Sequence, residues 1–293
     1  MLTASFLRYI ESQLNVKQKQ KLHIRRVKPI SGGSINLCAR IDTTSGVYFL
    51  KSNDSYKYPL MFEKEVHGLN VLRETKTISI PEVIMTGEEE GQAFLIMQFV
   101  EGSMRSPDFW KSFGTSLAKL HQTSSQRFGY QEDNYIGSLF QSNRQHNKWA
   151  DFFTEERLEQ QLKLAIVSGK MKNSDEVLFK KLYTLLDTII PIENPSLLHG
   201  DLWNGNFITG SKGEPYLVDP AVYYGHREID LAMTKLFGGF DDEFYQSYQE
   251  TFPLSPGFED RIHIHNLYPL MVHVNLFGGG YADQVRGILK KYA

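Results

Sequence analysis

The sequence is poor in cysteine: Cys38 is its only one in 293 residues. A single cysteine excludes an internal disulfide framework and a metal site built from a cysteine cluster. Cys38 lies in a stretch that we predict to be a strand, where a small buried residue is the expected role. This scarcity fits a reducing compartment, and we predict a cytoplasmic protein.

Long apolar runs and a surplus of one charge are also missing. No stretch approaches the roughly 18 uncharged apolar residues of a membrane-spanning helix, and residues 1–6 lack the basic start of a secretion signal. Basic residues number 32 and acidic residues 34, for a net charge of −2. An excess of positive charge would favour nucleic acid or an anionic membrane, so we predict neither as a partner. The oligomeric state stays open.

The chemistry-bearing stretch is 197–206, which reads Leu-Leu-His-Gly-Asp-Leu-Trp-Asn-Gly-Asn. Asp201 follows a short apolar segment, Asn206 comes five positions later, and a second apolar segment, 216–218, ends at Asp219. Two acids and an amide at the ends of adjacent strands are typical of metal-dependent phosphoryl transfer. We predict that Asp201 is the catalytic base, and that Asn206 and Asp219 hold Mg²⁺.

Other residues near this stretch have a structural alternative. We expect His199 to fix the loop through hydrogen bonds to the backbone, and Gly200 to leave room for a substrate. Asp230 either caps a helix or braces the catalytic loop. Trp203 either packs the loop or faces the substrate.

The first hundred residues supply candidates for binding a nucleotide. Gly32, Gly33 and Ser34 form a turn whose N–H groups would cover phosphates, and Lys51 ends a later strand within reach of phosphate oxygens. A Gly-Gly turn alone is more often an ordinary hairpin, but Lys51 and the stretch near residue 200 favour the nucleotide site. Glu65, in a predicted helix over 60–73, is the candidate ion-pair partner of Lys51. Glu63 is the alternative partner, and Glu65 would then be a solvated helix charge.

Periodicity divides the chain into two parts. Residues 3–17 and 60–73 have helical spacing, whereas 22–53, 80–86 and 93–100 read as strands. Beyond 102 the pattern is mainly helical, with stretches such as 149–167, 174–190 and 257–277. We predict an α+β, bilobal, protein-kinase-like fold with a five-stranded antiparallel sheet in an N-terminal lobe over 1–101 and a helical lobe over 102–293. By position alone, the crossing between lobes would bind adenine through the backbone of Gln98, Phe99, Val100 and Glu101.

Several motifs together resemble the fructosamine/ketosamine-3-kinase family over about residues 20–280. The His-Gly-Asp step is shared with aminoglycoside phosphotransferases and choline kinases, but the other motifs are more specific to this family. They are His199–Asn206, Asp219–Ala221, Tyr224–Glu228, Asn134–Leu139 and Phe237–Phe240.

The resemblance implies ATP- and Mg²⁺-dependent phosphorylation of the 3-hydroxyl of a ketoamine, the adduct of a reducing sugar and an amine. The unstable 3-phosphate then leaves, which makes the reaction a deglycation. The substrate would be a small ketoamine or a glycated protein, and Trp203, Asn204, Tyr224 and His226 are candidate substrate contacts. Asp219-Pro220-Ala221 replaces the Asp-Phe-Gly of protein kinases, so an activation-loop switch is not expected.

Two other functions remain open at this point. One is a small-molecule kinase of the aminoglycoside or choline type, whose cationic acceptors would call for an acidic pocket. The other is a catalytically silent, nucleotide-binding pseudokinase, against which the presence of Lys51, Asp201, Asn206 and Asp219 argues.

Overall fold

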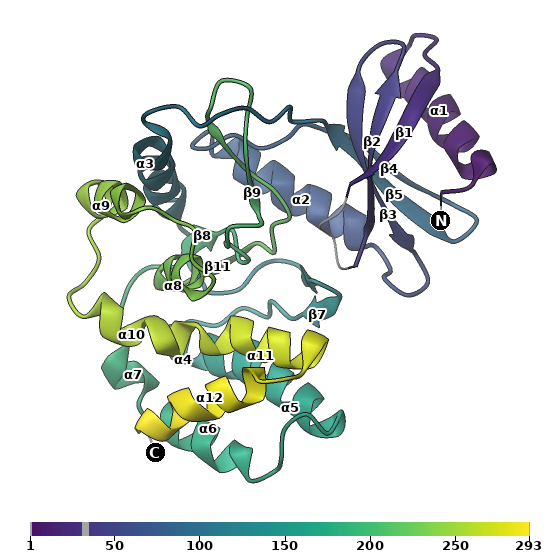
Figure 1. Cartoon of the computed structure of the whole chain (residues 1–293). Coiled ribbons are helices and arrows are strands. Elements are labelled where there is room, and N and C mark those ends of the chain that lie inside the picture. The colour runs from purple at the N-terminus through teal and green to yellow at the C-terminus, as the bar shows by residue number, and fades with distance from the viewer. Residues whose placement is uncertain (1, 31–34, 293) are drawn as a thin grey trace.

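A five-stranded antiparallel sheet forms the core of the N-terminal part of the molecule. The computed structural model describes residues 2–30 and 35–292, and the sheet stands apart from the helical remainder (Figure 1). Its strand order is β1-β2-β3-β5-β4, as a kinase-like N-terminal lobe requires. The elements are α1 (Ala4–Gln18), β1 (Ile24–Ile30), β2 (Leu37–Thr43), β3 (Val47–Asp54), α2 (Met61–Glu74), β4 (Val83–Glu89) and β5 (Gln92–Gln98).

The two faces of this sheet have different partners. Helix α1 begins after Thr3, whose hydroxyl accepts the N–H of Phe6 at 3.2 Å, and buries one apolar side against the sheet in a small core. Helix α2 contributes Phe62 and Leu69 to the larger core, which continues into the helical part. Strand β4 begins at Val83, later than the predicted residue 80, because Pro81 has no N–H to donate to a ladder.

The rest of the chain is mainly helical, as predicted. Short strands interrupt this helical part near the candidate site. The predicted boundary between the two lobes, at residue 101, falls in the irregular segment before α3. That boundary stays a prediction. The elements are α3 (Phe109–His121), β6 (Asn134–Ile136), β7 (Leu139–Gln141), α4 (Trp149–Phe152), a π-helical turn (Phe153–Leu158), α5 (Glu159–Val167), α6 (Asp175–Tyr183), α7 (Leu186–Ile189), β8 (Ser196–Leu198), β9 (Phe207–Thr209), β10 (Pro215–Leu217), β11 (Tyr223–Gly225), α8 (Glu228–Leu236), α9 (Asp242–Thr251), α10 (Phe258–His265), α11 (Leu267–Phe277), α12 (Tyr281–Leu289) and a 3₁₀ turn (Lys290–Tyr292).

Three predicted helices are divided. The stretch 149–167 contains the π-helical turn, 174–190 separates into α6 and α7, and 257–277 separates into α10 and α11 at Asn266. The last break has a clear cause, because Pro269 in the first turn of α11 cannot donate an N–H to the preceding helix. Within residues 2–30 and 35–292, no helix is both long enough and apolar enough to span a membrane.

Candidate active site

Four short strands carry the loop that holds Asp201. Strand β8 is fully buried and pairs with β11, with Leu198 opposite Tyr223. Strands β9 and β10 form the hairpin between them. Pairing of these strands returns the chain to the loop, so that Asp201 and Asp219 line the same cavity although they are 18 positions apart in the sequence.

Asp230 on α8 hydrogen-bonds to the backbone of the loop that holds Asp201. Its two carboxylate oxygens accept the backbone N–H groups of His199 at 2.8 Å and of Gly200 at 3.0 Å. His121 approaches the same carboxylate at 3.3 Å. Of the two roles that the sequence allowed for Asp230, the structure therefore shows the loop brace.

His199 is a structural residue of this loop. Its ring is fully buried, with Nε2 2.9 Å from the carbonyl of Val218 and Nδ1 3.3 Å from the N–H of Asp201. The N–H of Asp201 donates to Nδ1, which requires the tautomer with its proton on Nε2. This ring joins the two segments that carry Asp201 and Asp219.

Gly200 is required by the backbone, and the expectation that it leaves room for a substrate stays a prediction. Its φ is +82°, in the left-handed region that favours glycine. A Cβ built there would lie 2.1 Å from the carbonyl oxygen of Ala221. Only glycine allows the loop to approach the segment after Asp219 so closely.

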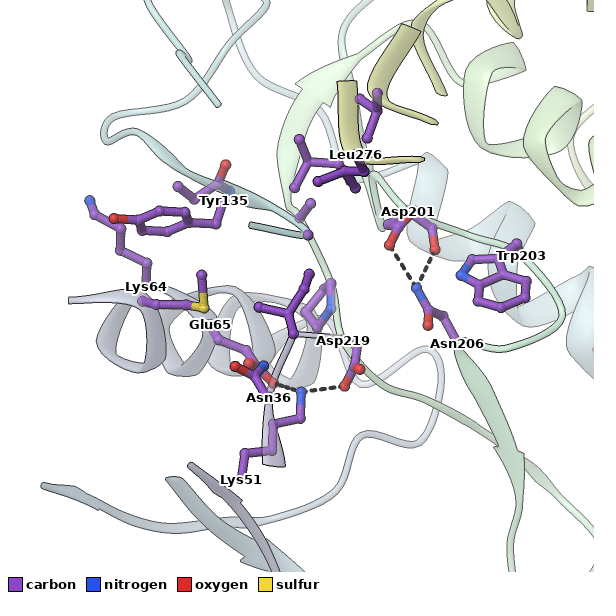
Figure 2. A pocket seen from close by; sticks show the side chains of 18 of the residues that line it. Asn36, Lys51, Lys64, Glu65, Tyr135, Asp201, Trp203, Asn206, Asp219 and Leu276 are labelled. Atoms are coloured by element: carbon purple, nitrogen blue, oxygen red, sulfur yellow. Dashed lines mark hydrogen bonds and ion pairs between the residues drawn. The ribbon is translucent and has the colours of Figure 1, made fainter. Parts of the chain in front are cut away.

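Asp201 and Asn206 face each other across the loop (Figure 2). The amide nitrogen of Asn206 donates to the Asp201 carbonyl at 2.8 Å and to its carboxylate at 2.9 Å. Burial raises the pKa of Asp201 to about 7, against the hydrogen bond from Asn206, which lowers it. A carboxyl with a pKa near neutrality is suited to accepting a proton from a hydroxyl.

Lys51 lies on the opposite wall between two carboxylates (Figure 2). Its Nζ is 2.6 Å from Glu65 and 2.5 Å from Asp219. Burial acts to lower the pKa of Lys51, but the two carboxylates outweigh it and hold the pKa above its ordinary value. The lysine thus remains charged, and Glu65 is its partner, while Glu63 is exposed.

Asp219 occupies an unusual backbone conformation. Its φ is +56°, in the left-handed region that non-glycine residues rarely adopt. Residues 220–222 then lead directly into β11. Such strain is typical of residues whose side-chain direction is set by the surrounding structure.

A cavity of about 200 Å³ lies between these two walls. Lys51, Glu65, Asp201, Asn206 and Asp219 all line it, and so does Trp203. The structure therefore brings the predicted base, the predicted metal ligands and the lysine pair to one place. Gly32, Gly33 and Ser34 lie outside the described residues.

The structure does not bring three of the predicted substrate contacts to this cavity, since Asn204, Tyr224 and His226 are not part of its lining. His226 is fully buried, with Nε2 3.1 Å from the carbonyl of Pro191. Tyr224 pairs through its backbone with Gly129. Motif membership alone pointed to His226 and Tyr224, and of these His226 is buried away from the cavity by packing.

The predicted hinge residues also lie outside the cavity lining. The N–H of Gln98 donates to the carbonyl of Glu82 at 2.7 Å. Arg40 covers the ring of Phe99 at 4.7 Å and approaches Glu101 at 3.4 Å. Val100 is half-buried in the segment that crosses from β5 to α3. Adenine binding by this segment stays a prediction.

Sequence reasoning missed one wall of the cavity. This wall comes from β6, with Gly137 after it, and from the last turns of α11. Neither was connected to the site from the sequence alone. The stretch 134–137 belongs to a quoted motif, and this was the one available signal. The additional lining residues are Ile35, Asn36, Cys38, Met61, Lys64, Asn134, Tyr135, Ile136, Gly137, Pro220, Ala221, Val272, His273, Leu276 and Phe277.

Comparison with known proteins decides the family. The family model for fructosamine kinase matches residues 7–293. The chain belongs to the fructosamine kinase family. A probable ketoamine kinase of Synechocystis is 40% identical over 96% of this chain and 95% of its own length. The chloroplastic protein-ribulosamine 3-kinase of Arabidopsis thaliana is 38% identical over 92% of this chain and 83% of its own length.

Solved structures agree with this membership. A candidate fructosamine-3-kinase of Thermobifida fusca is 30% identical, with a TM-score of 0.86 over 97% of this chain and 98% of that one. The aminoglycoside phosphotransferase APH(4)-Ia, at 17% identity and a TM-score of 0.58 over 98% and 99%, shares the fold. The predicted resemblance and the predicted kinase-like fold are confirmed. This fructosamine kinase family member is a phosphotransferase with an alcohol group as acceptor, and its kinase family implies ATP as the donor.

Proposed function

We propose that this protein transfers the terminal phosphoryl group of ATP to the 3-hydroxyl of a ketoamine, carried by a small amine or by a protein. The observation that carries the proposal is the convergence of Lys51, Glu65, Asp201, Asn206 and Asp219 on one cavity. The family membership and the ribulosamine 3-kinase relative support the acceptor class.

Asp201 acts as the general base in this proposal. Its carboxylate accepts the proton of the acceptor hydroxyl as the oxygen attacks phosphorus. Asn206 keeps that carboxylate oriented through its amide nitrogen. Asp230 holds the backbone of the loop, so the base does not have to be positioned by the substrate.

The residues opposite Asp201 fit the donor side of the reaction. Lys51 remains protonated beside Glu65 and would contact the phosphate oxygens of bound ATP. The donor set also fits Mg²⁺, which prefers oxygen ligands. The amide nitrogen of Asn206 is committed to Asp201, which leaves its oxygen, and the Asp219 side chain is half exposed. Asn206 and Asp219 would hold Mg²⁺, which neutralises charge on the transferred phosphoryl oxygens.

The charge of the cavity favours a ketoamine over a polycationic acceptor. Among the described lining residues, the carboxylates are Glu65, Asp201 and Asp219, and each has a role in phosphoryl transfer. An aminoglycoside would need further acidic groups to replace the water around its ammonium groups. The acceptor side offers aromatic and aliphatic surface instead, including Tyr135 and Phe277.

An acceptor screen tests the proposal. Purified protein with ATP and Mg²⁺ is given a synthetic fructosyl amine, a glycated protein, choline or kanamycin, and ADP release is measured. We expect ADP release with the ketoamines and a product that gains one phosphoryl group at its 3-hydroxyl. ADP release with kanamycin or choline alone would overturn the proposed acceptor, and absence of acceptor-dependent ADP release would overturn the proposed reaction.

A further inference from the structure

Helix α2, which carries Glu65, is held by the helical part of the molecule as well as by its own sheet. The partner is the segment 130–136, which precedes and includes β6. Tyr135 donates its hydroxyl to the carbonyl of Pro59 at 3.0 Å, just before α2 begins. Lys64 donates to the carbonyl of Asp133 at 2.5 Å. These two bonds fix the first turn of α2 to this segment.

A second group of contacts lies one turn further along α2. The His67 ring lies beside the Glu132 carboxylate, and the Lys64 ammonium lies 3.7 Å from the same carboxylate. Gln131 approaches the His67 ring at 3.3 Å. Gly68 allows close contact with the segment after Asp219, since a Cβ there would lie 3.2 Å from Val222. The polar contacts all come from one side of α2 and from one short segment.

Two adjacent residues of α2, Lys64 and Glu65, connect this segment to Lys51. Lys64 is bonded to the segment 130–136, and Glu65, the next residue, is bonded to Lys51 at 2.6 Å. Figure 2 shows Lys64 beside Tyr135, with Glu65 directed toward Lys51. Because Lys64 and Glu65 are consecutive residues of one helix, a shift of α2 away from Asp133 would also shift Glu65 relative to Lys51.

The same segment forms part of the acceptor side of the cavity. Asn134, Tyr135 and Ile136 line the same cavity as Asp201. An acceptor with its hydroxyl at Asp201 therefore lies against residues whose neighbours hold α2. One segment thus contacts both the place of the acceptor and the helix that positions Lys51.

We propose that the segment 130–136 is a positioning device, in which the contacts of Glu132 and Asp133 with α2 couple acceptor binding to the Lys51–Glu65 pair and so to nucleotide binding. This inference rests on the proposed function. Lys64, His67 and Glu132 are positioning residues, because they act through Glu65 and Lys51. Coupling between two sites is reciprocal, so each substrate strengthens binding of the other by the same factor, typically about fivefold or more.

Calorimetry on single variants tests this coupling. The dissociation constant of a non-hydrolysable ATP analogue with Mg²⁺ is measured with and without a saturating fructosyl amine. In the wild type, we expect the fructosyl amine to strengthen nucleotide binding. Glu132→Gln and Lys64→Met should reduce that effect to near onefold and raise the KM for ATP more than they lower kcat. Lys64→Arg, which keeps a donor at Asp133, should restore the coupling.

Glu63→Gln is the matched control, because Glu63 is an exposed acid on the first turn of the same helix. It should retain the coupling and the kinetics of the wild type. The Glu132 side chain is about one-third exposed, so we expect Glu132→Gln to fold. This variant therefore provides the test if Lys64→Met does not fold. Undiminished coupling in folded Glu132→Gln, or its absence in the wild type, would overturn the positioning role. Failure of the wild type to phosphorylate any ketoamine would instead overturn the proposed function.

Discussion

Asn206 is bonded twice to Asp201, through the backbone carbonyl at 2.8 Å and through the carboxylate at 2.9 Å. One amide group therefore fixes both the backbone position and the side-chain direction of the proposed base. In the proposed function the side-chain oxygen of Asn206 would bind Mg²⁺, so that one residue would connect the proposed base to the proposed metal site. The predictions below follow from this arrangement and from the elements that support it.

Replacing Asp201 by Asn should slow phosphoryl transfer strongly while nucleotide binding is retained. The amide has nearly the same shape but cannot accept the hydroxyl proton as a base. We expect turnover to fall by about 10²–10⁴-fold, with nucleotide affinity close to that of the wild type. Steady-state kinetics and calorimetric titration with an ATP analogue measure the two quantities. Turnover equal to that of the wild type would show that Asp201 is not the general base.

Gly200→Ala should destabilise the protein more than a left-handed backbone alone explains. The new Cβ would meet the Ala221 carbonyl at 2.1 Å. Gly169→Ala is the control, because Gly169 also has a positive φ, +71°, but nothing within 4 Å of its Cβ position. Gly169→Ala should lower the free energy of unfolding by about 1–2 kcal/mol. Gly200→Ala should lower it by more, and should also reduce turnover. Urea unfolding of both variants makes the comparison, and equal costs would contradict it.

Removal of divalent cations should abolish turnover, and added Mg²⁺ should restore it. Asn206→Ala and Asp219→Ala should each shift the activation curve to higher Mg²⁺ concentration, because each removes one proposed oxygen ligand. The measurement is turnover against free Mg²⁺ at saturating ATP. Glu63→Gln, with an acid removed from an exposed position outside the cavity lining, should follow the wild-type curve. An unchanged curve in both alanine variants would refute the proposed ligands.

His226 should contribute stability that is lost as the pH falls below about 6.5, whereas Asp201, whose pKa is raised to about 7, contributes in the opposite direction. Burial, together with the nearby His265, lowers the pKa of His226 from 6.5 to about 4. Between pH 6.5 and 4, His226 is therefore protonated in the unfolded state but neutral in the folded state. The contribution of His226 to stability is lost as the pH falls through this range. The loss is at most about 3 kcal/mol.

Glu228 extends this loss to lower pH. Burial acts to raise its pKa, but hydrogen bonds from Arg261 and His265 lower it to about 2. Its contribution is present above about 4.5 and is lost below that pH. Urea unfolding of the wild type and of His226→Gln between pH 7.5 and 4.5 isolates the His226 contribution, because the difference in stability between the two proteins should change with pH in this window. A difference that does not change with pH would contradict the assignment.

The sequence predicted the residues that depend on local pattern, and it failed where side-chain direction depends on distant packing. Asp201 and Asp219 follow short apolar strands and Asn206 precedes one, so strand and turn patterns place them. Lys51 lies on a strand as predicted, but β3 continues past it to Asp54, so the predicted strand end at Lys51 was wrong. Helix α11 supplies His273 to the cavity, but its apolar composition is that of any buried helix. His226 lies in the same motif as Tyr224, yet Trp149 and His265 pack around its ring. Periodicity does not show which side of a loop becomes buried.

The short connection after Asp219 has a consequence for control of the enzyme. Residues 220–222 alone separate Asp219 from β11, which is paired at once with β8. A connection of three residues leaves no room between Asp219 and β11 for a long loop of the kind that a modification could rearrange. If the proposed function holds, the rate of this enzyme would then be set by the supply of its substrates.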